Sequence, residues 1–158
     1  MAQLRPLSAS DVPAVRQWWR EHWGGDTMIA HGEVFHPEAL EGFAAEEGGR
    51  WVGLITCRLG QGECEITSLD SLQERQGTGT RLMQAVIQKA REAGCRRVRL
   101  TTTNDNLNAL GFYQKRGFAL LALRQGAVDE TRKVKPAIPL IGQNGIPLRD
   151  ELELELLL

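Results

Sequence analysis

Two glycines one residue apart, Gly77 and Gly79, lie between an apolar, strand-like run and an amphipathic helical pattern. This spacing predicts a tight loop, free of side chains, at the N-terminus of a helix. The first N–H groups of a helix have no acceptor within it, and the helix dipole places partial positive charge there, so such a loop can hold a phosphate group. We therefore predict that the backbone N–H groups of residues 76–80 bind phosphate.

Two well-known phosphate-binding patterns do not fit these glycines. A P-loop needs four residues between its glycines and then Lys before Ser or Thr, and this chain lacks that pattern. A dinucleotide-binding loop needs a third glycine three residues after the second, where this chain has Leu82. A bare glycine turn remains the alternative if the loop is considered alone.

A second cluster downstream has an Asn, an Ala three residues later, a Tyr four residues further on, and then Gly-Phe. Its members are Asn106, Ala109, Tyr113, Gly117 and Phe118. The cluster and the glycine loop, in this order, resemble the GNAT N-acetyltransferase superfamily, whose acyl-CoA pyrophosphate loop reads Gln/Arg-x-x-Gly-x-Gly/Ala. The matching residues of the loop are Glu74-Arg75-Gln76-Gly77-Thr78-Gly79. The resemblance covers nearly the whole chain.

The loop departs from the superfamily pattern at Glu74, where Gln or Arg is preferred. A carboxylate near a pyrophosphate is repelled by about 1 kcal/mol when exposed to solvent. Arg75 and Arg81 flank this position and can offset the repulsion. The affinity for CoA is therefore expected to depend mainly on the backbone N–H groups.

The resemblance implies the fold and the reaction. The expected fold is α/β with a mixed sheet: a single domain over residues 1–158 whose twisted, mostly antiparallel sheet is splayed in the middle and flanked by helices. The expected enzyme is an acyl-CoA-dependent N-acetyltransferase that moves acetyl from acetyl-CoA, as co-substrate, to the amine of a small molecule within a ternary complex. A protein N-terminus or lysine is the alternative acceptor, and a non-catalytic acyl-CoA-binding module is the alternative function.

The resemblance also implies which residues bind the cofactor. Residues 69–72 would pair with the pantetheine arm as if it were an added strand, a backbone N–H near Leu69 or Asp70 would hold the oxyanion, and Asn106 would hydrogen-bond the arm. The full cofactor-binding set is Leu69, Ser71, Leu72, Gln76, Gly77, Thr78, Gly79, Thr80, Arg81, Asn106, Ala109 and Tyr113.

Catalysis needs an acid and a base. Tyr113, the only tyrosine in the chain, is at the position that protonates the CoA thiolate in the superfamily, and an ordinary phenol pKa of about 10 suits that role. A core aromatic beside Phe112 is the alternative interpretation of Tyr113. For the base we rank Glu65 first, then Asp70 and Glu63, with a solvated strand carboxylate as the alternative for each.

Composition and charge limit the other classes of function. With 158 residues the chain can bury one core, and a net charge of −1 gives no reason to expect nucleic acid or a membrane surface as partner. The three cysteines show no metal-type pairing and are expected as reduced thiols, while His22, His31 and His36 are expected on the surface or in an acceptor loop. Because no signal segment or long apolar run is visible, we predict a cytoplasmic enzyme. Since neither the cysteines nor the histidines have the spacing of a common metal site, we predict no metal ion.

Hydrophobic periodicity and turn residues predict the order of elements. Ser8 or Ser10 should cap a first helix, with Asp11 completing a capping box, and Asn104 or Asn106 should cap a later one. Gly24-Gly25 should end the first helix, and Gly94 should end the long helix that follows the glycine loop. Strands are expected over residues 2–7, 39–45, 50–59, 63–72, 97–102, 118–123 and 151–156, and loops with a short helix over 26–38 and without one over 124–149. Uneven apolar spacing indicates a bulge near Thr67 and Ser68. The alternating Glu/Leu tail strand should have one wet face and could offer a homodimer edge.

Overall fold

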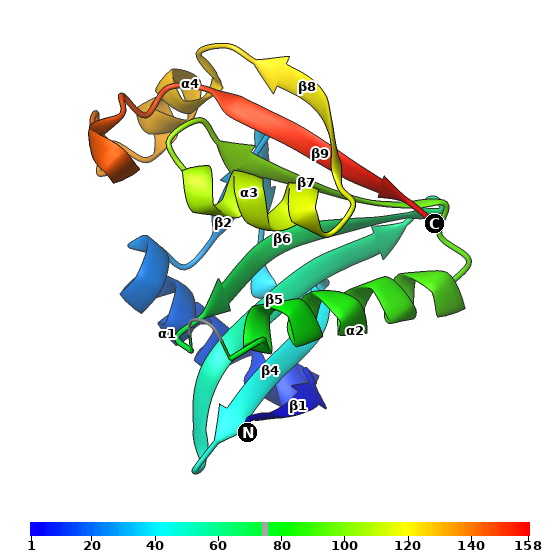
Figure 1. Ribbon diagram of the computed structural model, residues 1–158. Helices are drawn as coiled ribbons and strands as arrows, with labels where there is room; N and C mark the ends of the chain where they lie inside the picture. Colours follow the sequence, from blue (N-terminus) through cyan, green and yellow to red (C-terminus); the bar gives the residue numbers. More distant parts are fainter. Residues whose placement is uncertain (74–75) are drawn as a thin grey trace. The chain divides into compact units, whose positions relative to one another are not determined.

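The computed structural model describes residues 1–73 and 76–158, and the predictions for Glu74 and Arg75 lie outside these residues. The described chain divides into two compact units, the first made of residues 1–28, 35–98 and 158, the second of residues 29–34 and 99–157. Among the described residues, seven strands make up a mixed, mostly antiparallel sheet accompanied by four α-helices (Figure 1). The α/β fold class is therefore confirmed, whereas the splayed middle of the sheet and the single domain stay predictions.

The first unit contains four antiparallel strands in the order β1-β4-β5-β6. They are β1 (Gln3–Pro6), β4 (Glu41–Glu47), β5 (Arg50–Gly60) and β6 (Glu63–Ser71). Two-residue turns join the last three strands, Gly48-Gly49 with φ of 60° and 77°, and Gln61-Gly62 with φ of 54° and 74°. Positive φ at both central residues is the turn geometry that matches the twist of paired strands, which is why glycine occurs in each turn.

A bulge in β6 decides which side chains share a face of the sheet. Cys57 lies opposite Ile66 but Thr56 lies opposite Ser68, so Thr67 is the additional residue, as the uneven apolar spacing predicted. Side chains normally alternate between the two faces, and one additional residue reverses the alternation beyond it. Residues 65 and 70, which differ in parity, therefore lie on the same face.

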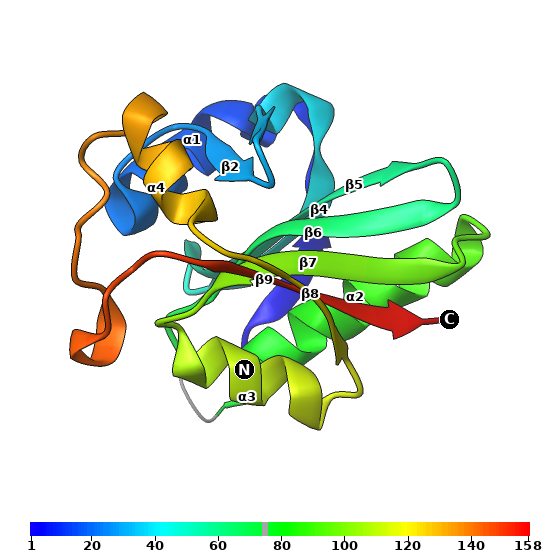
Figure 2. The same cartoon turned by 90° about the horizontal axis from the view of Figure 1, so that it is seen from above.

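Helices cover both faces of β4 to β6 (Figure 2). Helix α1 (Val12–Trp23) follows a 3₁₀ turn, η1 (Ala9–Asp11), and packs against Leu54 through its buried residues Val15, Trp18 and Trp19. The neighbouring residue Gly53 faces the opposite way, because a Cβ there would lie 3.0 Å from Leu82 of helix α2 (Thr78–Glu92). The two helices are thus separated by the thickness of the sheet.

The predicted C-terminal ends of these helices are confirmed, whereas Ser8 is the N-cap of η1 and Asp11 is the N-cap of α1. The backbone N–H of Ser8 donates to the Asp11 carboxylate (2.8 Å), as the predicted capping box requires. Gly24 (φ 77°) terminates α1 and Gly94 (φ 76°) follows the end of α2, both in the left-handed conformation that glycine adopts without a steric penalty. Among the described residues, no helix is both long enough and apolar enough to cross a bilayer.

The second unit contains the strands in the order β7-β9-β8. Its elements are β7 (Arg97–Thr103), α3 (Leu107–Lys115), β8 (Ala119–Arg124), α4 (Ala127–Val134), η3 (Gln143–Gly145) and β9 (Glu151–Leu157). Strand β7 begins with two residues of the first unit. Helix α4 was not predicted, and the connection over residues 124–149 is therefore not simply a loop.

Residues 26–38 also differ from the prediction. They form the short strands β2 (Met28–Ala30) and β3 (Glu33–Phe35), which pair with each other, and a 3₁₀ turn, η2 (Pro37–Ala39), is the short helix that was expected. The connecting turn is His31-Gly32, with φ of 43° and 77°. The pair is too short and too weakly alternating for its strands to be recognised from hydrophobic periodicity.

The prediction of a wet face on the tail strand is wrong. Glu151 and Glu153 of β9 are 4% and 7% exposed, and both form ion pairs with Arg124 of β8. Because β9 lies between β7 and β8, it has no open edge to offer a second copy of the chain. The homodimer itself stays a prediction, but β8 replaces β9 as its expected edge.

Candidate active site

The glycine loop has the backbone that phosphate binding requires. Gly77 is the N-cap of α2 with φ of 75°, and a Cβ at this position would meet no atom within 4 Å, so its conformation rather than crowding demands glycine. The first hydrogen bond of the helix runs from the Arg81 N–H to the Gly77 carbonyl (2.9 Å). The N–H groups of Thr78 and Gly79 precede it and so have no acceptor within the helix. They remain available to an anion at the positive end of the helix dipole.

Side chains around the loop hold it in place. The hydroxyl of Thr78, which is 2% exposed, donates to the side-chain oxygen of Gln73 (2.9 Å). The Arg81 guanidinium donates to the Ala2 carbonyl (2.7 Å), so it ties the start of the chain to the first turn of α2. Gln76 lies in the turn before the helix and is exposed.

The backbone of β6 distinguishes two candidates for the oxyanion donor. The Leu72 N–H donates to the Val52 carbonyl of the neighbouring strand (2.8 Å), and Asp70 lies opposite Leu54 in the same register. Since backbone groups of an antiparallel strand alternate in direction, the Asp70 N–H also points toward β5. The N–H groups of Leu69 and Ser71 point away from β5, where a pantetheine arm could pair with them. Leu69 is therefore the better candidate for the oxyanion donor.

The hydrogen-bond donors to the Asp70 carboxylate are two tryptophans of α1. Its Oδ2 accepts hydrogen bonds from the indole N–H groups of Trp23 (2.9 Å) and Trp18 (3.2 Å), both on α1. Burial raises the pKa of Asp70 above its usual value, while the two indole hydrogen bonds and the charge of His22 oppose the rise. A carboxylate with a raised pKa is better suited to accept a proton near neutral pH.

The other two candidate bases are paired with arginines. Glu65, 4% exposed, lies 3.2 Å from a guanidinium nitrogen of Arg58, the residue opposite it on β5. Glu63 accepts from Arg97 at 2.8 Å and 2.9 Å. Each of these carboxylates would have to give up an ion pair to take up a proton, so the contacts favour Asp70 and reverse the order expected from the sequence.

The second predicted cluster lies on α3 in the second unit. Asn106 is the N-cap, and its side-chain oxygen accepts from the Ala109 N–H (3.2 Å), which decides between the two predicted caps. Asn104 instead accepts from the N–H groups of Arg149 and Asp150, both at 3.0 Å, and so fixes the approach to β9. The amide nitrogen of Asn106 is not used in the cap and is the group that could meet a pantetheine carbonyl.

Tyr113 is 9% exposed and packs between aromatic neighbours. Its ring meets Phe112 edge-on with 5.5 Å between centroids and Phe118 at 5.8 Å. Asn106, Ala109 and Tyr113 are spaced by three and four residues, which places them along one side of the helix. The packing is compatible with both the acid and the core-aromatic interpretation, and the acid role stays a prediction.

The structure thus groups the predicted residues into two sets. One set follows β6 into α2, with the three carboxylates on one face of the strand and the glycine loop at its end; the other set lies on α3. The indole donors Trp18 and Trp23 were missed, because tryptophans at helical spacing are read from sequence as a packing stripe. Trp18 does belong to the packing stripe, whereas Trp23 is 49% exposed and lies outside the core.

Comparisons with known proteins agree with this arrangement. Residues 12–118 match the model of the acetyltransferase (GNAT) family. The uncharacterized protein YdhI of Bacillus subtilis (strain 168) is 46% identical over 136 residues, which cover 85% of this chain and 85% of that protein.

Solved structures share the fold at low sequence identity. An IAA acetyltransferase from Bacillus cereus is 17% identical with a TM-score of 0.78, and the match covers 100% of both chains. A GNAT family acetyltransferase from Elizabethkingia anophelis, solved with acetyl-CoA bound, is 19% identical with a TM-score of 0.72 over 99% of this chain and 98% of that one. On the family match and the identity to YdhI together, the chain belongs to the acetyltransferase (GNAT) family.

Proposed function

We propose that this protein transfers the acetyl group of acetyl-CoA to the amine of a small molecule. The observation that carries the proposal is the left-handed Gly77 before α2, which presents the N–H groups of Thr78 and Gly79 to an anion. Family membership supports the reaction class, and the relative from Elizabethkingia anophelis contains the same donor, acetyl-CoA.

Binding uses backbone groups for the most part. The diphosphate of acetyl-CoA lies at the N-terminus of α2, and the pantetheine arm pairs with the outward-pointing backbone of Ser71. The Leu69 N–H donates to the thioester oxygen, which gains negative charge as the amine attacks. Such positioning lowers the barrier by converting a reaction between two separate molecules into one between bound groups.

Two proton transfers complete the reaction. Asp70 takes a proton from the incoming ammonium, directly or through a water molecule, and the freed amine attacks the thioester carbon. The new C–N bond forms as the C–S bond breaks, and the Tyr113 hydroxyl protonates the departing thiolate. The phenol recovers its proton from the acetylated nitrogen, so one proton per turnover passes from Asp70 to solvent.

Release of free thiol from acetyl-CoA across a panel of small amines tests the reaction. Tyr113→Phe is expected to lower kcat by about 10²-fold, in the range of a lost general acid, with little change in CoA affinity measured by calorimetry. An unchanged rate would remove Tyr113 from the acid role. Absence of heat with both CoA and acetyl-CoA, in a folded sample, would contradict the whole proposal.

The two leading carboxylates form a matched test. Asp70→Asn should lower kcat/KM by about 10²-fold or more, whereas Glu65→Gln should lower it by less than about tenfold. Because burial raises the pKa of Asp70, kcat/KM should fall as the pH drops through that value, and this limb should vanish in Asp70→Asn. A larger loss in Glu65→Gln would restore the order expected from the sequence.

The same assay separates the remaining alternatives. Acetylation of a protein N-terminus or lysine predicts turnover with peptides and none with small amines, and a non-catalytic module predicts CoA binding without thiol release. We also infer that the reaction takes place in the cytoplasm and needs no metal ion, nucleic acid or membrane, so chelators should leave the rate unchanged.

A further inference from the structure

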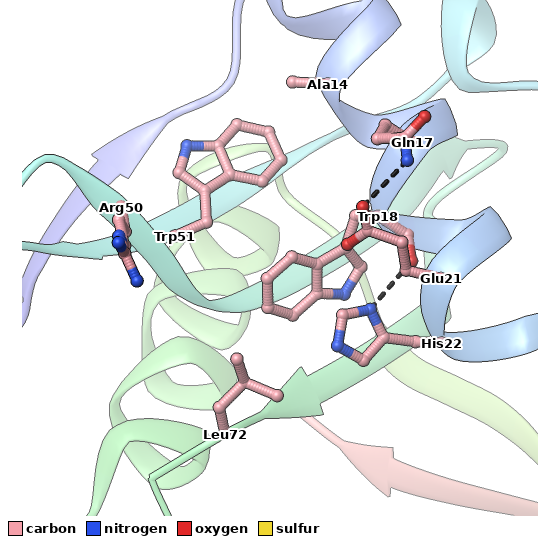
Figure 3. Close-up of a pocket in the computed structure, with 8 residues that line it drawn as sticks. All are labelled: Ala14, Gln17, Trp18, Glu21, His22, Arg50, Trp51 and Leu72. Carbon is pink, nitrogen blue, oxygen red and sulfur yellow. Dashed lines mark hydrogen bonds between the residues drawn. The ribbon is translucent and has the colours of Figure 1, made fainter.

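A hollow of about 440 Å³ opens beside α1 in the first unit (Figure 3). Its volume falls within the range of roughly 300–1,000 Å³ that is usual for small-molecule sites. Five residues at helical spacing on α1 form one wall, and residues at the start of β5 and beyond the end of β6 form the other. The lining residues are Ala14, Gln17, Trp18, Glu21, His22, Arg50, Trp51 and Leu72.

The walls of the hollow are mainly apolar. The rings of Trp18 and Trp51 lie with 6.3 Å between centroids at an angle of 54°, and Leu72 is 56% exposed. Both indole N–H groups are committed elsewhere, that of Trp18 to Asp70 and that of Trp51 to Glu46 (3.3 Å). The two rings therefore offer hydrocarbon surface to a ligand rather than hydrogen-bond donors.

Polar groups of α1 at the hollow have partners within the helix. His22 stacks on Trp18 with 4.1 Å between centroids, and its Nδ1 lies 2.8 Å from the Trp18 carbonyl oxygen. The Glu21 carboxylate accepts a hydrogen bond from the Gln17 amide (2.8 Å). These contacts keep the α1 wall in place without a ligand.

Arg50 differs from the polar residues of α1, which have hydrogen-bond partners within their own helix. It comes from the opposite side of the hollow in Figure 3, and its guanidinium makes no hydrogen bond or ion pair with any residue in the described part of the chain. A guanidinium beside apolar rings can bind a carboxylate through two parallel N–H donors. Glu21, the one carboxylate among the lining residues, is already hydrogen-bonded to the Gln17 amide, so the Arg50 guanidinium is the charged group at the hollow that is left to bind a ligand.

We propose that this hollow binds a small apolar carboxylate, with its aryl or alkyl body between Trp18, Trp51 and Leu72 and its carboxylate on Arg50. The site is distinct from the glycine loop, because none of its lining residues belongs to residues 76–81, and it shares one residue, Leu72, with the set expected to bind the pantetheine arm. Trp18 connects the hollow with Asp70, since its ring lines the hollow while its indole N–H donates to the Asp70 carboxylate. A ligand here would contact the residue that holds the proposed base.

Three compounds with one carbon skeleton test the charge preference: 4-phenylbutyrate, 4-phenylbutylamine and 4-phenyl-1-butanol. Calorimetry should show the carboxylate binding about fivefold more tightly than the alcohol, as expected for a partly exposed ion pair. The indole N–H signals of Trp18 and Trp51 should shift in nitrogen-edited NMR spectra, while that of Trp19, which does not line the hollow, should stay. Equal binding of all three compounds, preference for the amine or no binding would overturn the proposal.

Arg50→Gln should remove the preference for the carboxylate and leave the alcohol unaffected. Arg91→Gln is the matched control, because Arg91 lies exposed in the last turn of α2 and away from the hollow. Circular dichroism of both variants establishes that they are folded. A carboxylate preference that survives in Arg50→Gln would also overturn the proposal.

The titration is then repeated with saturating CoA. Affinity for 4-phenylbutyrate should not change, whereas loss of binding would assign the hollow to CoA and contradict the proposal. None of these measurements needs turnover, so the site can be confirmed even if the protein proves not to transfer acetyl groups.

Discussion

Strands β8 and β9 are neighbours in the second unit, and their side chains reverse the usual relation between polarity and burial. Glu151 and Glu153 of β9 are 4% and 7% exposed, whereas Leu120 and Leu123 of β8 are 56% and 62% exposed. The difference teaches that burial follows from the position of a strand in the sheet and from the partners it finds. The apolar or charged character of a side chain does not by itself decide whether it is buried, either in β8 or in β9.

The buried carboxylates of β9 are matched by donors from several elements. Arg124 donates to Glu153 (2.8 Å), to Glu151 (3.1 Å) and to the Thr101 hydroxyl (2.9 Å). Arg99 lies 3.1 Å from Glu153, and the His31 N–H donates to Glu151 at 3.0 Å. Burial of charge is tolerated when each group is paired and hydrogen-bonded, as both carboxylates are.

Strand β8 has the opposite problem, because β9 is its one neighbour in the strand order of the described residues. Its first five residues, Ala119-Leu120-Leu121-Ala122-Leu123, are all exposed and carry no charge. Natural edge strands commonly carry lysine, proline or a bulge that blocks pairing with another chain. Only the irregular register between Leu120 and Ala122 serves that purpose here.

The largest effect is expected where a partner of the buried carboxylates is removed. Arg124→Met should lower the free energy of unfolding by about 3–5 kcal/mol, because it leaves Glu151 and Glu153 buried without their main cation. Urea denaturation measures the change. Arg91→Met, at an exposed site, should stay within about 0.5 kcal/mol, and similar losses in both variants would break the comparison.

The next effect compares one substitution in both strands. Leu154 and Leu120 lie opposite each other, yet Leu154 is 0% exposed and Leu120 is 56% exposed. Leu154→Ala should cost about 2–5 kcal/mol of unfolding free energy, because it opens a cavity, whereas Leu120→Ala should cost less than about 1 kcal/mol. Comparable costs by chemical denaturation would show that β8 is covered in solution.

A smaller, pH-dependent effect is expected from Asp150, which precedes β9. Hydrogen bonds from Arg149 and from the Gly126 N–H lower the pKa of Asp150 below its ordinary value of 3.8. The folded protein then binds fewer protons than the unfolded chain, so this stabilisation is present above pH 3.8 and is lost as the pH falls through the lower folded value. Asp150→Asn should flatten the acid side of the stability profile, and Leu123→Lys on β8 should leave its shape unchanged.

The smallest change in stability is expected when charge is added to β8. Leu121→Lys together with Leu123→Lys should alter the unfolding free energy by no more than about 0.5 kcal/mol per site. The same pair should prevent self-association in sedimentation experiments if two copies meet through this edge. A dimer that survives both lysines would remove β8 as the expected edge.

Local sequence patterns predicted what depends on neighbouring residues. The bulge at Thr67 followed from uneven apolar spacing, and the Gly24 and Gly94 helix ends followed from the conformations that glycine adopts. The spacing of Gly77 and Gly79 predicted the tight loop before α2 for the same reason. These features are set within a few residues, so the sequence around them contains the necessary information.

Features that depend on distant partners were missed. The burial of Glu153 depends on Arg124, which is 29 residues away along the chain, and strand alternation cannot reveal such a partner. Helix α4 was not predicted because the connection that contains it is rich in Gly and Pro. Acidic residues in its first turn and Arg132 in its last turn are nevertheless a recognisable helix signal. The contacts that favour Asp70 over Glu65 could not be read from the sequence, because indole donors and ion pairs are tertiary features, and the choice of base stays a prediction.

Because Thr67 is an additional residue in β6, the number of residues in this strand determines which face Asp70 occupies. Substitution at Thr67 would cost its hydroxyl contact with Thr56 (2.7 Å) but would leave the count of residues intact. Deletion of the same residue would turn Asp70 toward α2 and away from the tryptophans of α1. Relatives that keep Glu65 and Asp70 on one face of the strand should therefore vary freely in the amino acid at position 67, and very little in the number of residues between the two carboxylates.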